Sequence, residues 1–454
     1  MSARRPHSNF VALSVLAAWA TLAALGDPAR AAGPSPEPEP APAPADTTLH
    51  KFLGTLADST DRYFGMSAAP LDTAGLGSSG SFVPEHGRRL KFGVLPSFDF
   101  NRADGSTFGA GLRLEGPRPY GKLKLQAAYA VAAKDWLGGA EYFRRVRRTG
   151  AYWTLQGWGG RETAPMNRDH FEPFLDPSRA LSTGSDRSHY LRHDGWRASF
   201  ERESGLWRLG LGVRDLLETP LATRATWDLF HRDLIVPGNL PADYGRAREI
   251  QLTAGGRLPA VPLRLEADYW TSGPGLKSDF TYDRVRLAVG GDITIGRWAS
   301  LVPQAVWGHV NGRGGPQQAF YLGAGPTLVS VPRDALGGTS FGLAKLEVIA
   351  VRDLLGLLRI PHPELLYFQP AIFGATGAVG GADPFGGPAR PGELWPERAS
   401  WLSEAGVALH YMPGLFGITV RMSEAWPIGP TTRGERFEFL ISHPLDLLRK
   451  PLED

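Results

Sequence analysis

From residue 90 onward, the chain consists mostly of segments of about ten residues in which apolar and polar side chains alternate. Between Lys122 and Val131, for example, Leu123 and Leu125 are separated by Lys124. A period of two predicts β-strands with one apolar and one polar face. Strands that span a bilayer must close into a barrel, because each backbone polar group needs a partner within the lipid. The alternation therefore predicts an all-β fold, a transmembrane antiparallel β-barrel.

The alternating segments predict about 16 strands within residues 89–443. They lie near residues 89–100, 107–115, 121–132, 138–147, 150–158, 189–202, 206–215, 246–258, 261–272, 281–295, 297–309, 340–352, 364–376, 401–412, 415–424 and 434–443. Residues 317–328 also resemble a strand, but one more strand would make the count odd and invert every later connection. We therefore assign them to an inward loop over residues 310–339 that closes the lumen.

The connections between these strands are short on one side and long on the other. The long ones span residues 159–188, 216–245, 310–339 and 377–400. Short periplasmic turns and longer extracellular loops are typical of outer-membrane barrels. The asymmetry therefore favours an outer-membrane barrel.

Residues 1–31 have the features of a cleaved secretory signal peptide. Arg4 and Arg5 precede an apolar run over residues 11–26, and residues 29–31 (Ala-Arg-Ala) offer the small residues that signal peptidase reads. A retained membrane anchor is the alternative, but the apolar run is shorter than the roughly 20 residues that a spanning helix needs. A cleaved signal would direct the barrel to the outer membrane of a Gram-negative envelope.

Residues 32–88 form a region ahead of the barrel. Residues 33–46 are rich in Pro, Ala and Glu and predict an extended linker. Apolar residues at helical spacing predict a short amphipathic helix within residues 48–63, which either rests on the periplasmic rim or inserts as a plug. Residues 444–454 are expected to form a C-terminal tail.

Composition argues against several classes of function. The chain has no cysteine, which removes lipidation, disulfides and thiolate chemistry. Its net charge is +3, and basic and acidic residues are interleaved along the strands, so nucleic-acid binding is not expected. No hydrolase or phosphate-binding motif is present, and we predict no enzyme, no cofactor and no metal site. His189 and His193 invite a metal interpretation, but on a strand they stand about 13 Å apart.

Three stretches of the barrel region carry motifs in a fixed order. Residues 92–112 read FGVLPSFDFNRADGSTFGAGL, residues 320–338 read FYLGAGPTLVSVPRDALGG, and residues 403–442 contain a Gly-rich strand followed by a hairpin and a final strand. They resemble the opening hairpin, the sixth extracellular loop and the ending of BamA-like bacterial surface antigen barrels. The resemblance spans residues 89–443 and implies an outer-membrane barrel in transport or membrane assembly.

The chain departs from this family in its loop and in its N-terminal region. Family members that insert or export proteins carry an Arg-Gly-aromatic tripeptide in that loop, where Val329, Ser330 and Val331 stand here. Such members also hold client proteins on periplasmic POTRA domains, for which residues 32–88 leave no room. The chain therefore resembles a member without these domains and with a degenerate loop motif.

Arg333 is a candidate substitute for the missing loop arginine. A guanidinium forms paired hydrogen bonds with a carboxylate, so Arg333 would contact Glu347, Glu404 or Glu424 on the barrel wall. The alternative is an exposed loop arginine beside Asp334.

Charged residues on the polar faces of the strands are candidates for the lumen lining. They include Arg197, Arg264, Glu266, Asp268, Arg286 and Arg421. These residues would form either an ion-selective lining or the ordinary mixture of charges that fills a wide barrel.

We expect an integral outer-membrane β-barrel that functions in envelope transport or outer-membrane assembly. Its expected partners are membrane lipid and other envelope assembly proteins, and it is expected to be a monomer. One alternative is a structural or adhesive surface barrel without transport. A further alternative is an outer-membrane enzyme that acts on lipid, for which His410 and Ser423 would be candidate residues.

Overall fold

The chain divides into two compact units, Met1–Phe52 and Leu53–Asp454, and every described residue lies in the second. In the computed structural model, the described residues are 79–82, 90–116, 120–166, 181, 188–225, 227, 238–259, 261–323, 327–363, 367–390, 392–411, 420–429 and 435–441. The predicted signal peptide, Pro-rich linker, short helix and C-terminal tail lie outside these residues.

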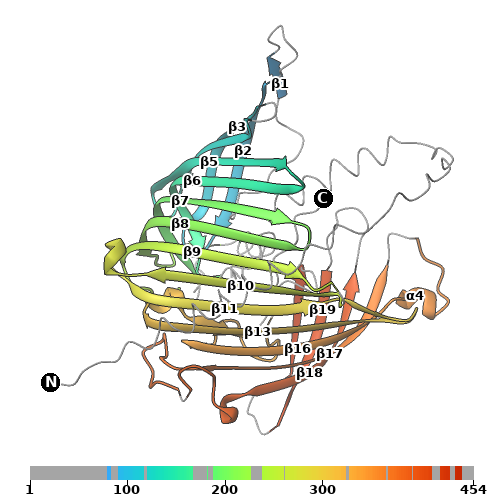
Figure 1. Cartoon of the computed structure of the whole chain (residues 1–454). Coiled ribbons are helices and arrows are strands. Elements are labelled where there is room, and N and C mark those ends of the chain that lie inside the picture. Colours follow the sequence, from blue (N-terminus) through green and yellow to red (C-terminus); the bar gives the residue numbers. More distant parts are fainter. Residues whose placement is uncertain are drawn as a thin grey trace. The chain divides into compact units, whose positions relative to one another are not determined.

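Sixteen long strands form most of the large sheet in the described part of the chain (Figure 1). In chain order they are β2 (Leu90–Asn101), β3 (Gly105–Glu115), β4 (Lys122–Ala130), β5 (Asp135–Arg148), β6 (Ala151–Pro165), β7 (Tyr190–Ser204), β8 (Trp207–Pro220), β9 (Gly245–Arg257), β10 (Leu263–Ser272), β11 (Thr281–Gly291), β13 (Ala299–Arg313), β16 (Ser340–Ala350), β17 (Phe368–Gly380), β18 (Leu402–Tyr411), β19 (Val420–Ile428) and β20 (Arg436–Ile441). Each overlaps one predicted strand, so the predicted antiparallel all-β fold is confirmed. Two short strands, β1 (Ser79–Phe82) and β12 (Ile293–Ile295), bring the sheet to 18 strands.

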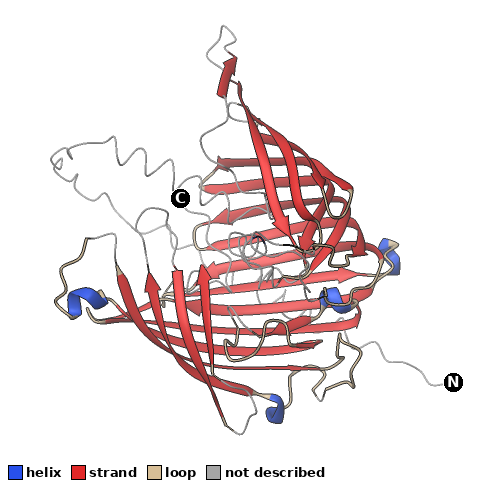
Figure 2. Ribbon diagram, turned by 180° about the vertical axis from the view of Figure 1, so that it is seen from behind, coloured by secondary structure: helices blue, strands red, loops and turns tan. Residues whose placement is uncertain are grey.

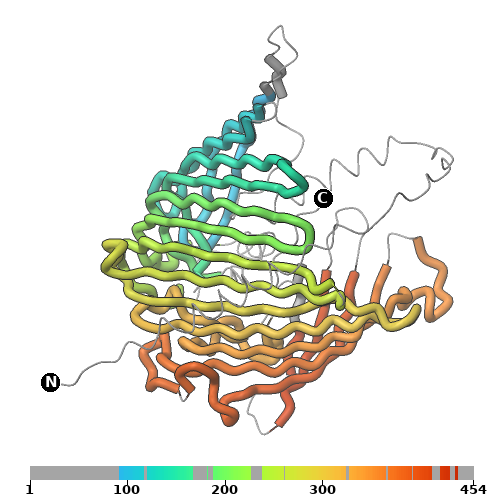
Figure 3. Tube along the Cα trace, in the orientation of Figure 1, coloured from blue at the N-terminus to red at the C-terminus, as the bar shows by residue number. Residues whose placement is uncertain are grey.

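Consecutive long strands pair with one another from β2 through to β20, and they lie side by side in Figures 2 and 3. The longest connections, residues 166–189, 221–244, 314–339 and 381–401, all lie at one end of the strands. Tight turns such as residues 149–150 and 205–206 lie at the other end. The β16–β17 connection (residues 351–367) is the exception, since it is long and lies at the end with the tight turns.

In the part of the chain that the structure describes, the sheet is not closed, although the alternation predicts a closed barrel. Among the described residues, β20 pairs with β19, and no pairing joins it to β1 or β2. One physical reason is that β1 already occupies this edge of β2, with Ser79 opposite Gly93 and Phe82 opposite Leu90. The backbone groups that β20 would need along this stretch are therefore already paired.

Residues 314–339 form a connection with a small sheet of its own. Within it, β14 (Phe320–Leu322) pairs with β15 (Leu336–Gly338) and with no strand of the large sheet. The described residues of the range 317–328 therefore add no strand to the large sheet.

One face of the large sheet carries exposed apolar side chains. Leu155 of β6 pairs with Phe200 of β7, which pairs with Leu211 of β8, and all three are more than 40% exposed. Apolar surface of this kind is unfavourable in water but favourable in contact with lipid. The outer face thus has the composition of a lipid-facing wall.

The other face of the sheet carries buried charges. Its buried ionisable side chains include His193, Glu218, Glu249, Glu266, Asp268, Arg286, Lys345, Glu347, Glu404, His410 and Arg421. Charged groups alternate along the strands with the exposed apolar ones because successive side chains of a strand point to opposite faces. In the described ranges no helix is long and apolar enough to cross a bilayer.

We expect the outer face to tolerate a charge poorly. Leu211→Arg should lower the free energy of unfolding in lipid vesicles by about 2–4 kcal/mol if this position lies near the bilayer centre. Leu394→Arg, at an exposed position of the β17–β18 connection, is the matched control and should change it by less than about 0.5 kcal/mol. Denaturant titration of the refolded protein measures both values, and equal effects would argue against a lipid-facing wall.

Candidate functional site

The connection from residue 314 to residue 339, here called the β13–β16 loop, packs against the buried face of the sheet. The Phe320 ring stacks on Phe341 of β16, with ring centroids 5.6 Å apart. The Arg284 guanidinium of β11 lies over the same Phe320 ring, 4.3 Å from its centroid. The buried apolar side chains of the loop are Phe320, Tyr321, Leu322, Leu328, Val329 and Val331. The loop is therefore held against the sheet by apolar burial, by ring stacking and by a cation–π contact.

Glu404 of β18 accepts hydrogen bonds from two consecutive backbone amides of this loop. The Val329 N–H donates to Oε1 (2.9 Å), and the Ser330 N–H donates to Oε2 (2.7 Å). Both residues lie in a turn in which the Val331 N–H donates to the Leu328 carbonyl. Hydrogen bonds to an ionised acceptor are stronger than neutral ones. A wall carboxylate therefore holds the loop at the positions where the resembling family has its Arg-Gly-aromatic tripeptide.

A second contact joins the loop to β8 through Gln317. Its side-chain Nε2 donates to Glu218 Oε2 (3.1 Å) and to the Asp243 carbonyl (3.1 Å). Its Oε1 accepts from the Asp243 N–H (3.1 Å). The Gln317 amide thus connects the loop to the wall and to the β8–β9 connection.

A third contact involves His189, which lies before β7. His189 Nε2 lies 3.8 Å from Asp334 Oδ2 of the loop. On its other side, His189 Nδ1 accepts from the Leu240 N–H (3.0 Å) and lies 2.7 Å from the Arg102 guanidinium. His189 therefore joins the β13–β16 loop to three other connections at the same end of the sheet.

Within the loop, Tyr321 links β14 to the short helix η2 (Pro316–Gln318). Burial and the nearby carboxylates of Asp334 and Asp383 raise the pKa of the Tyr321 phenol above its usual range. The phenol therefore stays protonated at neutral pH and donates to the Pro316 carbonyl (2.7 Å).

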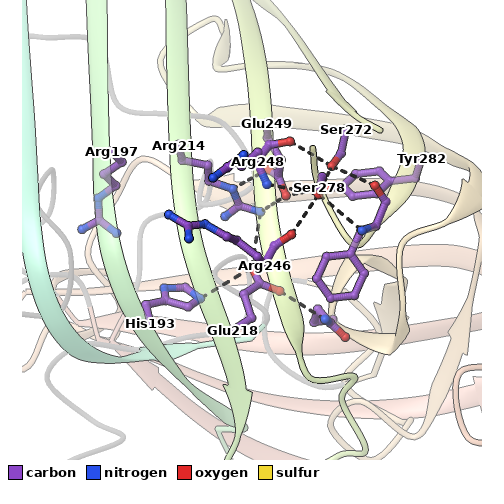
Figure 4. A network of polar contacts seen from close by, with 12 residues as sticks. His193, Arg197, Arg214, Glu218, Arg246, Arg248, Glu249, Ser272, Ser278 and Tyr282 are labelled. Carbon is purple, nitrogen blue, oxygen red and sulfur yellow. Dashed lines mark hydrogen bonds and ion pairs between the residues drawn. The ribbon is translucent and has the colours of Figure 1, made fainter. Parts of the chain in front are cut away.

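Glu218 belongs to a buried polar network between β7 and β11 (Figure 4). The Arg214 guanidinium donates to both carboxylate oxygens of Glu249, which also accepts from the Tyr282 hydroxyl. Arg214 and His193 lie 3.6 and 3.8 Å from Glu218. Buried carboxylates are costly without such partners. The network therefore fixes the position of Glu218, the wall residue that Gln317 contacts.

Of the predicted lining residues, Glu266, Asp268, Arg286 and Arg421 are buried, and Arg197 and Arg264 are half-buried. The Arg286 guanidinium lies 3.5 Å from Asp268 and 4.0 Å from Glu266. Arg197 donates to Glu162 of β6 (2.7 Å), and Arg264 lies two positions before Glu266 on the same face. These placements form a mixture of both signs of charge along the buried face.

Arg421 joins a second buried cluster around Glu347. The Glu347 carboxylate accepts from Arg421 Nε (3.2 Å), and His410 Nε2 lies 2.8 Å from the same oxygen. Arg421 also donates to the Ser423 hydroxyl (3.0 Å). Ser423 is thus bonded to an arginine, and no hydrogen bond between Ser423 and His410 occurs among the described residues.

Two of the three predicted wall carboxylates, Glu347 and Glu404, lie on the buried face of the sheet. Arg333 is half-buried, and the backbone amides of Val329 and Ser330 donate to the two carboxylate oxygens of Glu404. Glu424 lies on the other face of the sheet, since its register partner Val407 is exposed. Alternation along β19 makes this unavoidable, because Ser423 and Ala425 on either side of Glu424 are buried.

Several residues of the site were missed in the sequence. Glu218 was missed because the strand was predicted to end at residue 215, whereas β8 continues to Pro220. Continuing the alternation from Arg214 would have placed Glu218 on the same face. Glu249 and Tyr282 lay within predicted strands, and their alternation with neighbouring apolar residues carried the signal.

In the part of the chain that the structure describes, no group of three or more His, Asp or Glu side chains is arranged to hold a metal ion. His189 contacts Arg102, whereas His193 lies beside Glu162 and Glu218. The two histidines therefore belong to different clusters.

The chain is similar to several solved β-rich structures. BamA from Haemophilus ducreyi lacking POTRA domains 1–3 is 13% identical, with a TM-score of 0.47 over 87% of this chain and 81% of that one. CdiB from Acinetobacter baumannii is 10% identical, with a TM-score of 0.41 over 82% of this chain and 65% of that one. OccK11 (OpdR) from Pseudomonas aeruginosa is 12% identical, with a TM-score of 0.36 over 80% and 91%.

No protein-family model and no curated protein matches the sequence. The structural matches include a BamA structure, a member of the family that the sequence motifs resemble. With TM-scores below 0.5, these similarities assign no function to this chain.

We expect Glu404 to control the local stability of the loop. Glu404→Gln removes one acceptor oxygen and the charge, which should weaken the closed loop by about 1.5–3 kcal/mol. Hydrogen–deuterium exchange at the Val329 and Ser330 amides should accelerate by at least about tenfold as a result.

Glu424→Gln is the matched control, because Glu424 lies on the neighbouring strand β19 and on the opposite face of the sheet from Glu404. Exchange at the two loop amides should be unchanged in this variant. Unchanged exchange in Glu404→Gln, or equal acceleration in both variants, would contradict the role of Glu404.

Proposed function

We propose that the protein is an integral outer-membrane β-barrel that functions in envelope transport or outer-membrane assembly, with the β13–β16 loop closing its interior. The observation that carries this proposal is the attachment of the loop to the charged face of the sheet through Glu404. A wall that faces lipid on one side and holds a folded loop on the other suits a closed or gated channel.

The two faces of the sheet support the membrane part of the proposal. Outer-membrane strands alternate apolar-out and polar-in, and β6 to β8 carry exposed Leu155, Phe200 and Leu211 on one face. Glu218 and His193 are buried on the opposite face of the same strands. We infer that this opposite face lines the interior.

The loop contacts support the closing part of the proposal. Glu218 and Glu404 stand on different strands of the wall, and His189 stands in the connection before β7. They contact three different parts of the loop. A loop held at separate points crosses the interior instead of projecting from it. Release of these contacts would open a path along the charged face.

The proposal includes the setting expected from the sequence. Residues 1–31 act as a cleaved signal peptide, residues 32–88 as a linker with a short helix, and residues 89–443 as the barrel. Localisation is in the outer membrane of a Gram-negative envelope, as a monomer in contact with membrane lipid. Other envelope assembly proteins are the proposed partners.

Ion conductance in planar bilayers tests the proposal. The refolded protein should pass little current, because the loop closes the interior. Deletion of residues 314–337 should produce large, stable currents. The double variant Gln317→Ala/Glu404→Ala keeps the loop but removes two wall contacts, and it should show intermittent openings.

Glu424→Gln should behave like the unmodified protein, since it leaves these contacts intact. Refolding of each variant is checked by its resistance to protease. Absence of current from correctly folded deletion and double variants would contradict the transport proposal and would favour a structural or adhesive barrel.

A further inference from the structure

An exposed apolar cluster lies where the turn before β13 meets the β16–β17 connection, which contains α4 (Leu354–Leu357, labelled in Figure 1). The two segments are joined because the Val351 N–H donates to the Trp298 carbonyl (2.9 Å). The apolar side chains of this cluster, here called the edge patch, are Ile295, Trp298, Val351, Leu357, Leu358 and Ile360, with exposed fractions from 37% to 60%.

The edge patch is held in place by specific hydrogen bonds. Asp353 accepts from the Gly356 N–H and the Phe368 N–H, both at 2.6 Å, and thereby caps α4. Although burial raises the pKa of the Asp353 carboxyl, these two N–H groups and His362 lower it below its usual value. The Tyr367 hydroxyl also donates to the Val351 carbonyl (2.6 Å). A fixed framework therefore presents these leucines to the outside.

Three exposed arginines surround the apolar side chains. The guanidinium groups of Arg297 and Arg352 lie over the Trp298 ring, 4.8 and 4.5 Å from its centroid, and Arg359 lies between Leu358 and Ile360. The acidic side chains in the described residues of these two segments are the capping Asp353 and the exposed Asp292. Among the described residues of the two segments, three exposed arginines therefore stand against two carboxylates, of which Asp353 is buried.

The edge patch continues the apolar outer face of the sheet. Leu346 of β16 and Ile372 of β17 are exposed on the two strands that the connection joins. If this outer face contacts lipid, the edge patch lies at the level of the headgroups on the side of the short connections. Apolar side chains flanked by arginines suit this level, because the alkyl groups reach the acyl boundary and the guanidinium groups reach phosphates.

We propose that the edge patch binds anionic phospholipid, with Arg297, Arg352 and Arg359 contacting the headgroup phosphates and the leucines inserting beside the acyl chains. This inference rests on the proposed membrane function. Basic residues near a membrane surface favour anionic over zwitterionic lipid, and the guanidinium fork matches phosphate geometry. The bound lipid would anchor the β16–β17 connection against the bilayer.

Electron paramagnetic resonance with spin-labelled lipids tests the proposal on the full chain refolded into phosphatidylcholine vesicles. The measured quantity is the motionally restricted fraction of labelled phosphatidylglycerol compared with that of labelled phosphatidylcholine. The unmodified protein should prefer phosphatidylglycerol by about threefold or more at low salt. The triple variant Arg297→Gln/Arg352→Gln/Arg359→Gln should lose most of this preference.

A control variant removes the same charge at the other end of the strands. Lys277→Gln/Arg313→Gln/Arg398→Gln changes exposed residues outside the edge patch and should keep the preference. Replacing the three patch arginines by lysine should keep much of it, because the charge is preserved. This result separates lipid binding from a packing role of the arginines.

The outcomes distinguish this inference from the proposed membrane function. If the unmodified protein restricts neither lipid, the barrel is not inserted and the membrane function itself fails. If it restricts phosphatidylcholine but shows no preference for phosphatidylglycerol, the barrel stands and the edge patch proposal is overturned. An equal loss of preference in both glutamine variants would also overturn it.

Discussion

Hydrogen bonding between neighbouring strands is the constraint on which the rest of this structure depends. Each long strand from β2 to β19 pairs with the strands before and after it, so its side chains are fixed on one of two faces. The pairing of Leu155, Phe200 and Leu211 across three strands shows how this register gathers apolar side chains on the exposed face. The same register gathers charges on the other face, where Glu218 and Glu249 lie. The strand register therefore determines both the apolar exposed face and the charged buried face of the sheet.

The charged face imposes a further requirement, because buried carboxylates need partners. Glu249 meets this need with Arg214 and Tyr282 from the wall itself. Glu404 instead accepts from backbone amides of the β13–β16 loop, and Glu218 accepts from Gln317 of that loop. The loop thereby becomes part of the buried face instead of an appendage at its end.

The fold could be predicted from the sequence because the apolar–polar alternation repeats over many strands. The residues of the site could be predicted only in part. Glu404 was one of three carboxylates predicted to contact the loop. Its donors are the backbone amides of Val329 and Ser330, and backbone amides cannot be recognised in a sequence because every non-proline residue carries one. Arg333 was proposed as donor because only side chains can be read directly. The short strand β1 was not predicted because its sequence SGSF has little apolar alternation. Its pairing with the edge of β2 was therefore not predicted either.

The central claim is that the two faces of the sheet meet lipid on one side and a closed interior on the other. The chain contains no cysteine, so single nitroxide labels can be placed at will. With the protein refolded in vesicles, labels at Leu209→Cys and Leu211→Cys should be relaxed strongly by oxygen and weakly by a water-soluble nickel complex. Labels at Arg208→Cys and Gln251→Cys, on the opposite face, should show low exposure to oxygen. Equal access of the nickel complex to both faces would contradict the account.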